Sequence, residues 1–227
     1  MADRNPLTDA HLAPAVPSPG GPGMAPGDSV LMAEVRDELR RGFSALAAVK
    51  RGVSVFGSAR TRPDDPDYEL ARAVAGRLGA DGFAIITGGG AGIMEAANRG
   101  ARDAESVSIG LSLGERMNAY VDLPLRFQHV FTRKLMFVRY ASAFLVFPGG
   151  FGTLDEVFEL AALMQTGKVS SLPVVLVRRP YWEPLLGWLR DFALPAGKIS
   201  AAELDLLALA DDEAEICELL GRAARRI

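Results

Sequence analysis

Short, continuous runs of apolar residues alternate along the chain with longer segments in which apolar residues recur every three or four positions. Runs of the first kind are typical of strands buried on both faces, and the second spacing is typical of amphipathic helices. The pattern therefore predicts an α/β domain. Its expected architecture is a Rossmann-like, doubly wound parallel sheet with helices on both faces.

The apolar runs predict strands at 53–56, 83–86, 107–111, 143–147, 173–177 and 206–210. The periodic segments predict helices at 66–79, 95–102, 131–140, 154–165, 181–192 and 211–225. Asp211 is the expected N-cap of the last helix. Residues 114–126 show neither period, so we expect irregular structure there, with an extended stretch at 118–121.

The N-terminal region divides into two parts. Residues 1–28 are rich in proline and glycine and cannot bury much apolar surface, which predicts a disordered tail. From Ser29, a candidate N-cap, helical periodicity predicts a helix packed on the domain edge or on a partner subunit. We therefore expect one nucleotide-binding domain at 29–227, with an N-terminal helix.

The stretch from Pro148 to Glu156 is the strongest functional signal. Its three glycines join a strand end to a helix start, where free backbone N–H groups favour an anion. Thr153 can cap the helix and can donate its hydroxyl to a phosphate. Glu156 lies about one turn into the helix, so we expect it to face a part of the ligand other than the phosphate.

A second glycine-rich turn, Thr87 to Met94, follows the strand at 83–86. Its GGGxG spacing differs from the dinucleotide fingerprint GxGxxG, and no acidic residue ends a strand about 20 residues later. A phosphate or ribose contact is one interpretation. The alternative is that the glycines serve only close packing of helix and strand.

A third polar turn, Gly57 to Arg60, follows the first strand. Arg60 is expected to pair either with a phosphate or with the acidic residues that follow, Asp64, Asp65 and Asp67. Because ligands of open parallel sheets bind beyond the carboxyl ends of the strands, we expect the three turns to gather at one edge.

The helix at 131–140 carries two adjacent bases, Arg133 and Lys134, among apolar residues. They face either solvent or an anionic ligand, since the helix leads into the strand before the 148–156 turn. His129 is a candidate general acid, but it has no visible partner in the sequence, and a structural role is favoured.

The composition of the chain limits the cellular compartment and the binding partners that we expect. A net charge of −3 gives no general affinity for nucleic acid, and no apolar run approaches the roughly 18 residues of a membrane span. The single cysteine, Cys217, excludes an internal disulfide and fits a reducing compartment. With no signal peptide evident, we expect a cytoplasmic protein without membrane or nucleic-acid partners.

The candidate chemistry follows from what the turns offer. Metal-ligand spacing, a Ser–His or Cys–His pair and a GxxxxGK[ST] loop are all missing from the sequence, so we expect neither metal nor cofactor. A nucleotide or sugar phosphate is the natural ligand. Glu156 is suited to stabilise an oxocarbenium-like ribose or to activate water, and both roles belong to cleavage of a glycosidic bond.

The 148–156 stretch resembles the PGGxGTxxE motif of the Lonely Guy (LOG) family, the 88–94 turn is similar to that family's GGGxxGxM turn, and Arg133-Lys134 resembles its RK pair. The resemblance implies a cytokinin riboside 5′-monophosphate phosphoribohydrolase that releases an N6-substituted adenine and ribose 5-phosphate, with AMP as a further substrate. Some members carry the label lysine decarboxylase, but no lysine of this chain lies in a recognisable pyridoxal-phosphate context.

Carried over residue by residue, the resemblance implies a catalytic pair, Arg133 and Glu156, and a homodimer with the site near the subunit interface. The implied substrate-binding residues are Ser58, Gly88, Gly89, Gly90, Gly92, Met94, Lys134, Gly149, Gly150, Gly152 and Thr153. The residues before Arg133 are Phe131-Thr132 rather than the MHE of short plant-like members. This difference bears on which base is preferred more than on which reaction is catalysed. A non-catalytic nucleotide sensor is the first alternative, and an NAD-dependent oxidoreductase is disfavoured by the missing fingerprint.

Overall fold

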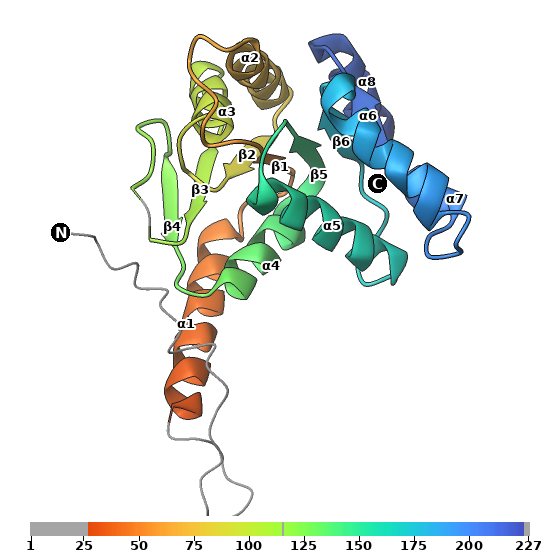
Figure 1. Cartoon of the computed structure of the whole chain (residues 1–227). Helices are drawn as coiled ribbons and strands as arrows, with labels where there is room; N and C mark the ends of the chain where they lie inside the picture. Colours follow the sequence, from red (N-terminus) through yellow and green to blue (C-terminus); the bar gives the residue numbers. More distant parts are fainter. Residues whose placement is uncertain (1–26, 115, 225–227) are drawn as a thin grey trace, which may run out of the picture.

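The computed structural model describes residues 27–114 and 116–224, so most of the predicted 1–28 tail lies outside the described residues (Figure 1). Within them, seven strands form one parallel sheet in the order β4-β3-β2-β1-β5-β6-β7. The strands are β1 (Gly52–Phe56), β2 (Ala84–Thr87), β3 (Ser108–Ser112), β4 (Leu123–Arg126), β5 (Ala141–Val146), β6 (Val174–Val177) and β7 (Leu207–Ala210). The predicted doubly wound α/β fold is confirmed.

Helices cover both faces of the sheet. They are α1 (Asp28–Leu46), α2 (Pro66–Ala80), α3 (Ile93–Asp103), α4 (Val130–Tyr140), α5 (Phe151–Gln165), α6 (Arg179–Trp188), a π-helical turn (Leu189–Ala193), α7 (Ala201–Leu204) and α8 (Glu213–Ala224). The apolar residues of α2, α3 and α8 pack in one core, and those of α1, α4, α5 and α6 pack in the other. Successive side chains of β1, β2, β5 and β6 alternate between these cores, which explains their continuous apolar runs.

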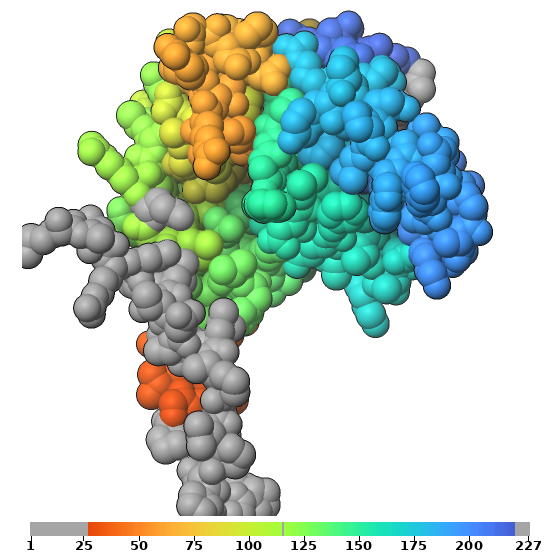
Figure 2. All heavy atoms as spheres, in the orientation of Figure 1, coloured from red at the N-terminus to blue at the C-terminus, as the bar shows by residue number. Residues whose placement is uncertain are grey.

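The N-terminal helix extends beyond the body of the domain (Figures 1 and 2). Its buried residues, Glu38, Gly42 and Leu46, all lie in its second half, where it packs on α4. The predicted N-cap, Ser29, is wrong, because the helix begins at Asp28 and Gly27 occupies the cap position. The expected packing of this helix on the domain edge holds for its second half.

Two further predictions of local structure are wrong. Residues 118–121 are not a strand, and the extended element of the 114–126 segment is β4, which pairs with β3. Asp211 is not the cap of α8, because its carboxylate accepts the backbone N–H of Arg179 at 2.6 Å. Asp212 takes the capping position instead and accepts the N–H of Glu215 at 2.9 Å.

Candidate active site

The three predicted turns meet at one edge of the sheet, because β2, β1 and β5 are neighbours in it. This is where the strand order reverses, the usual ligand position in such folds. Ser58 joins all three turns. Its N–H donates to the carbonyl of Pro148 at 3.0 Å, and its carbonyl accepts the N–H of Ile93 at 3.1 Å.

Gly92 makes that junction possible. It has φ of +66°, and a Cβ there would lie 2.3 Å from the carbonyl oxygen of Ser58. A side chain is therefore excluded both by backbone conformation and by the close approach of α3 to the first turn. The packing interpretation of the second glycine turn holds for this residue.

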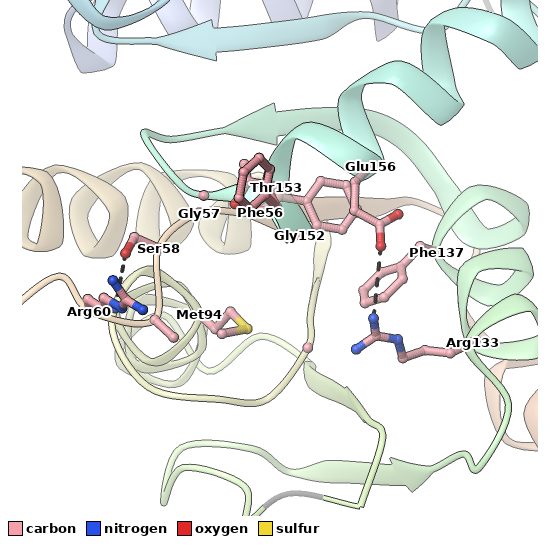
Figure 3. A pocket seen from close by; sticks show the side chains of 14 residues that line it. Phe56, Gly57, Ser58, Arg60, Met94, Arg133, Phe137, Gly152, Thr153 and Glu156 are labelled. Atoms are coloured by element: carbon pink, nitrogen blue, oxygen red, sulfur yellow. Dashed lines mark hydrogen bonds and ion pairs between the residues drawn. The ribbon is translucent and has the colours of Figure 1, made fainter. Parts of the chain in front are cut away.

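A pocket of about 590 Å³ opens between the three turns (Figure 3). Its volume is in the range of small-molecule sites. It is lined by Phe56, Gly57, Ser58, Ala59, Arg60, Gly88, Met94, Arg133, Phe137, Gly150, Phe151, Gly152, Thr153 and Glu156.

The start of α5 forms one side of the pocket. Gly150 is the N-cap residue, so the N–H groups of Phe151 and Gly152 have no acceptor within the helix. The predicted capping role of Thr153 is wrong, because it is the third helical residue and α5 has no side-chain cap. Its hydroxyl lies over Gly149, where a Cβ would come within 2.1 Å of it. The N-terminus of α5 can accept an anion, as the glycine spacing predicted.

Glu156 and Arg133 lie opposite each other in the pocket (Figure 3). The Glu156 carboxylate is 3.9 Å from the Arg133 guanidinium, and the two side chains are only 8% and 19% exposed. Burial raises the pKa of Glu156 to about 7, although Lys134 and Arg133 both oppose the rise. The carboxylate is thus near its midpoint at neutral pH, as suits a general base.

Lys134 is not among the residues that line the pocket and instead pairs with residues of α5. Its ammonium pairs with Asp155 at 2.8 Å and with Glu159 at 2.9 Å. Burial alone would lower the pKa of Lys134, but these two carboxylates raise it above the ordinary value. The contacts of Lys134 join α4 to α5 and thereby hold Arg133 beside Glu156.

The structure brings most of the predicted site residues to the pocket. Those that line it are Ser58, Gly88, Met94, Arg133, Gly150, Gly152, Thr153 and Glu156, and those that do not are Gly89, Gly90, Gly92, Lys134 and Gly149. Gly90 supports the pocket from behind, since a Cβ there would lie 2.7 Å from the methyl carbon of Met94. Substrate binding by the predicted residues remains a prediction.

Aromatic side chains complete the pocket and were not among the predicted site residues. Phe56 and Phe137 touch edge to face, with ring centroids 5.1 Å apart. Phe137 follows Arg133 by one helical turn, and the guanidinium lies 5.6 Å from its ring centroid. The i, i+4 spacing from Arg133 was a usable signal for Phe137. Phe151, 91% exposed, is the variable residue of the PGGxG turn.

The structure excludes one of the two predicted partners of Arg60, the acidic residues that follow it. Arg60 lines the pocket, and each acidic residue that follows has another partner: Asp64 pairs with Arg62, Asp65 caps α2, and Asp67 binds Arg178. The pairing of Arg60 with these carboxylates is therefore wrong.

His129 lies outside the pocket. Its ring is 7% exposed, and its Nδ1 lies 3.2 Å from the carboxylate of Glu38. This position favours the structural role over that of a general acid. Among the described residues, no cluster of three or more His, Cys, Asp or Glu side chains is placed to bind a metal ion. No helix in the described ranges has the length and apolarity needed to cross a membrane.

Solved structures support the fold. The molybdenum cofactor binding protein of Rippkaea orientalis superposes with a TM-score of 0.59 at 21% identity, covering 77% of this chain and 98% of that one.

Curated relatives resemble parts of this chain. A protein of Oryza sativa named probable cytokinin riboside 5′-monophosphate phosphoribohydrolase LOG4 is 37% identical over 40% of each chain. The cytokinin riboside 5′-monophosphate phosphoribohydrolase of Mycobacterium marinum is 29% identical over 66% of this chain and 83% of its own. The pyrimidine/purine nucleotide 5′-monophosphate nucleosidase of Escherichia coli K12 is 32% identical over 50% of this chain and 28% of its own. The chain thus spans less than half the length of the rice relative.

The model of the family described as "Possible lysine decarboxylase" matches residues 94–220, which include Arg133 and the whole 148–156 turn. Because this match covers more than half of the sequence, the chain belongs to that family, the Lonely Guy family.

Proposed function

We propose that the protein hydrolyses the N-glycosidic bond of adenosine 5′-monophosphates, N6-substituted ones included, to free base and ribose 5-phosphate. The observation that carries this proposal is the pair of buried Glu156, about one turn from the N-terminus of α5, and half-buried Arg133, 3.9 Å apart. A phosphate-binding helix start and an ionisable carboxylate face one pocket. The spacing suits a nucleotide whose phosphate and anomeric carbon must be held together.

In this reaction the 5′-phosphate accepts hydrogen bonds from the first N–H groups of α5 and from Thr153. The C1′–N bond breaks with its electron pair on the base, and positive charge develops on the ribose ring. The ionised Glu156 stabilises that charge and takes a proton from the water whose hydroxyl adds to C1′. The leaving base takes a proton from solvent, and Glu156 then returns its proton to solvent. Arg133 holds the ribose or phosphate and orients the carboxylate.

The relatives support hydrolysis more strongly than they support one base. The names of the rice and M. marinum proteins specify cytokinin riboside 5′-monophosphates, whereas that of the E. coli protein specifies purine and pyrimidine 5′-monophosphates. All three names share a nucleoside 5′-monophosphate. We therefore place phosphate recognition first and propose that the pocket between Met94 and the aromatic side chains receives the base.

Product analysis tests the proposal directly. Purified protein is incubated with AMP, isopentenyladenosine monophosphate, CMP and adenosine, and free base and ribose 5-phosphate are measured by chromatography. We expect base from the two adenosine monophosphates and little from adenosine, which lacks the phosphate. Glu156→Gln should lower the rate by about 10²- to 10⁴-fold. Glu183→Gln, an exposed change on α6, is the matched control.

The competing proposal, a nucleotide sensor, predicts tight binding of a monophosphate without turnover. Calorimetric titration of the same nucleotides separates the two. Saturable binding with no base released by the wild-type protein would contradict the proposed hydrolysis. A full rate in Glu156→Gln would contradict the role proposed for Glu156.

We further propose that the protein is a homodimer and acts in the cytoplasm, where nucleotide 5′-monophosphates are available. Phe131 and Leu135, one turn apart on α4, and Phe158 on α5 are 55%, 42% and 43% exposed. These helices also carry Arg133 and Glu156, so a partner placed on them would adjoin the site. Light scattering should give twice the chain mass, and Phe131→Asp should shift the mass toward that of one chain.

A further inference from the structure

The second half of α1 packs closely on α4. Gly42 allows the approach, because a Cβ there would lie 2.7 Å from the sulfur of Met136. One helical turn earlier, Glu38 is 2% exposed. A buried glutamate is rare unless it is paired, so its partners indicate what it does.

The partners of Glu38 all lie at the start of α4. Its carboxylate accepts the backbone N–H of Gln128 at 2.6 Å and that of His129 at 3.4 Å. It also accepts a hydrogen bond from the hydroxyl of Thr132 at 2.5 Å, and it lies 3.2 Å from Nδ1 of His129. The cap residue of α4, His129, makes no side-chain cap of its own. A carboxylate from α1 therefore caps α4 across the helix interface through the N–H group of the N-cap residue, His129, and is favourably placed against the helix dipole.

This cap lies next to the reacting groups. Arg133 follows Thr132, and its N–H donates to the carbonyl of His129 at 3.3 Å, so it belongs to the capped first turn. Successive helical residues point about 100° apart, so Thr132 faces α1 while Arg133 faces the pocket. Lys134, which is bound to α5, faces a third direction. Contacts on two other sides of α4 thus set the rotation of the turn that carries Arg133.

We propose that Glu38 is a positioning residue: by capping α4 from α1, it fixes the Arg133 guanidinium against Glu156. The N-terminal helix α1, which lies beside α4 (Figure 1), would thereby support the geometry of the site. The proposal rests on the proposed hydrolysis for its kinetic test, but the capping itself has a readout that needs no turnover.

Two pairs of variants separate positioning from stability. Glu38→Gln keeps the shape of the side chain but places an amide against backbone donors, and Asp37→Asn, exposed on the same helix, is its control. Thr132→Val removes the hydroxyl that Glu38 accepts, and Thr132→Ser restores it. Thr132→Val tests the proposal even if Glu38→Gln does not fold.

The kinetic test uses AMP hydrolysis, with melting temperatures measured in parallel. We expect Glu38→Gln and Thr132→Val to lower kcat by about 10- to 100-fold with KM changed less, as for a misplaced catalytic group. Thr132→Ser and Asp37→Asn should stay close to wild type. Unchanged kcat in both folded variants would overturn the proposal, even if their melting temperatures fall.

The pH profile is the readout that a purely structural role would not move. The charged groups that face Glu156 are Lys134 and Arg133 on α4, which lower its pKa, and Glu159 and Asp155 on α5, which raise it. When Arg133 is displaced, Glu156 loses a nearby cation. The midpoint of the rise in kcat/KM should therefore move to higher pH in Glu38→Gln and stay in place in Asp37→Asn. An unmoved midpoint overturns the proposal.

Hydrogen exchange distinguishes failure of this proposal from failure of the proposed function. If the wild-type protein releases no base, the proposed function fails, and two other measurements still test the cap. In Glu38→Gln, the amides of Gln128 and His129, which donate to the carboxylate, should lose protection, and AMP should bind more weakly by calorimetry. Unchanged protection and unchanged affinity would overturn the positioning role.

Discussion

The Glu156 carboxylate lies 3.9 Å from the Arg133 guanidinium, yet its pKa is raised to about 7 because burial outweighs the neighbouring cations. The proposed reaction needs the ionised form. In the free enzyme, kcat/KM for AMP should therefore rise with pH through about 7 and level off above it. Initial rates from pH 5 to 9 in buffers of constant ionic strength test this. A rate that falls with pH would assign Glu156 as a general acid instead.

The same raised pKa predicts a stability cost. An ordinary pKa of 4.5 and a folded-state pKa of about 7 mean that the folded protein favours protonated Glu156. Ionisation therefore destabilises the fold, fully above pH 7 and not at all below pH 4.5. Because 1 pKa unit corresponds to about 1.4 kcal/mol, the rise from 4.5 to about 7 means that Glu156→Gln should be more stable than wild type by about 3 kcal/mol at pH 8.

Urea denaturation measures this difference. The gain in free energy of unfolding should shrink between pH 7 and pH 5. The exposed control Glu183→Gln should show no such gain. A Glu156→Gln protein that is less stable than wild type at pH 8 would mean that the carboxylate contributes net stability, contrary to its buried position.

Lys134→Met distinguishes substrate binding from a supporting role. If Lys134 binds substrate, Lys134→Met should raise KM for AMP and leave the midpoint of the kcat/KM pH profile unchanged. Its contacts with Asp155 and Glu159 predict a different result. Removing the ammonium takes away the main group that lowers the pKa of Glu156. The midpoint of the pH profile should then move to higher pH, measured beside Lys168→Met as a control. A raised KM with an unmoved midpoint favours substrate binding.

The sequence predicted the alternation of strands and helices well, because each central strand is a continuous apolar run covered on both faces. The strand β4 was missed for a physical reason: it lies at the sheet edge, contains Pro124 and alternates between exposed and half-buried residues. Edge strands need no continuous apolar run. Their pairing is decided by a neighbour that the local pattern does not contain.

The site was predictable where its functional residues are close together in the sequence, as at the 148–156 turn. Glu38 was not, because a glutamate on an amphipathic helix has the same sequence pattern whether it faces water or caps another helix. Its partners are 90 or more residues away. Phe56 was missed for a related reason, since a phenylalanine at the end of a buried strand resembles any core residue.

Gly92→Ala tests the junction of the turns. The substitution combines φ of +66° with a Cβ 2.3 Å from the backbone of Ser58, so the turns must separate. Gly82→Ala is the control, because φ is +84° there but nothing lies within 4 Å. We expect about 1 kcal/mol of destabilisation for Gly82→Ala and several times more for Gly92→Ala. Equal losses in denaturation curves would show that the contact with Ser58 matters little.

Gly150→Ala tests anion binding by the backbone without disturbing the fold. Gly150 has an ordinary φ of −87°, and a Cβ there would meet nothing within 4 Å. The alanine variant should therefore lose at most about 1 kcal/mol of stability, because glycine is preferred over alanine at an N-cap. The new methyl group would lie at the start of α5, where the phosphate must approach the N–H groups closely. KM for AMP should rise by about 10-fold, the effect of losing about 1.4 kcal/mol of binding.

The control for Gly150→Ala is Gly187→Ala, which also meets open space but lies in α6 outside the pocket. It should leave KM unchanged and raise stability by up to about 1 kcal/mol, because alanine favours a helix more than glycine does. Inorganic phosphate gives a second measure, because it should inhibit the wild-type protein more strongly than Gly150→Ala if both bind at the same helix start. If KM and phosphate inhibition are both unchanged in Gly150→Ala, the phosphate does not bind at the start of α5. Ser58 and Arg60, which also line the pocket, would then be the alternative binding groups.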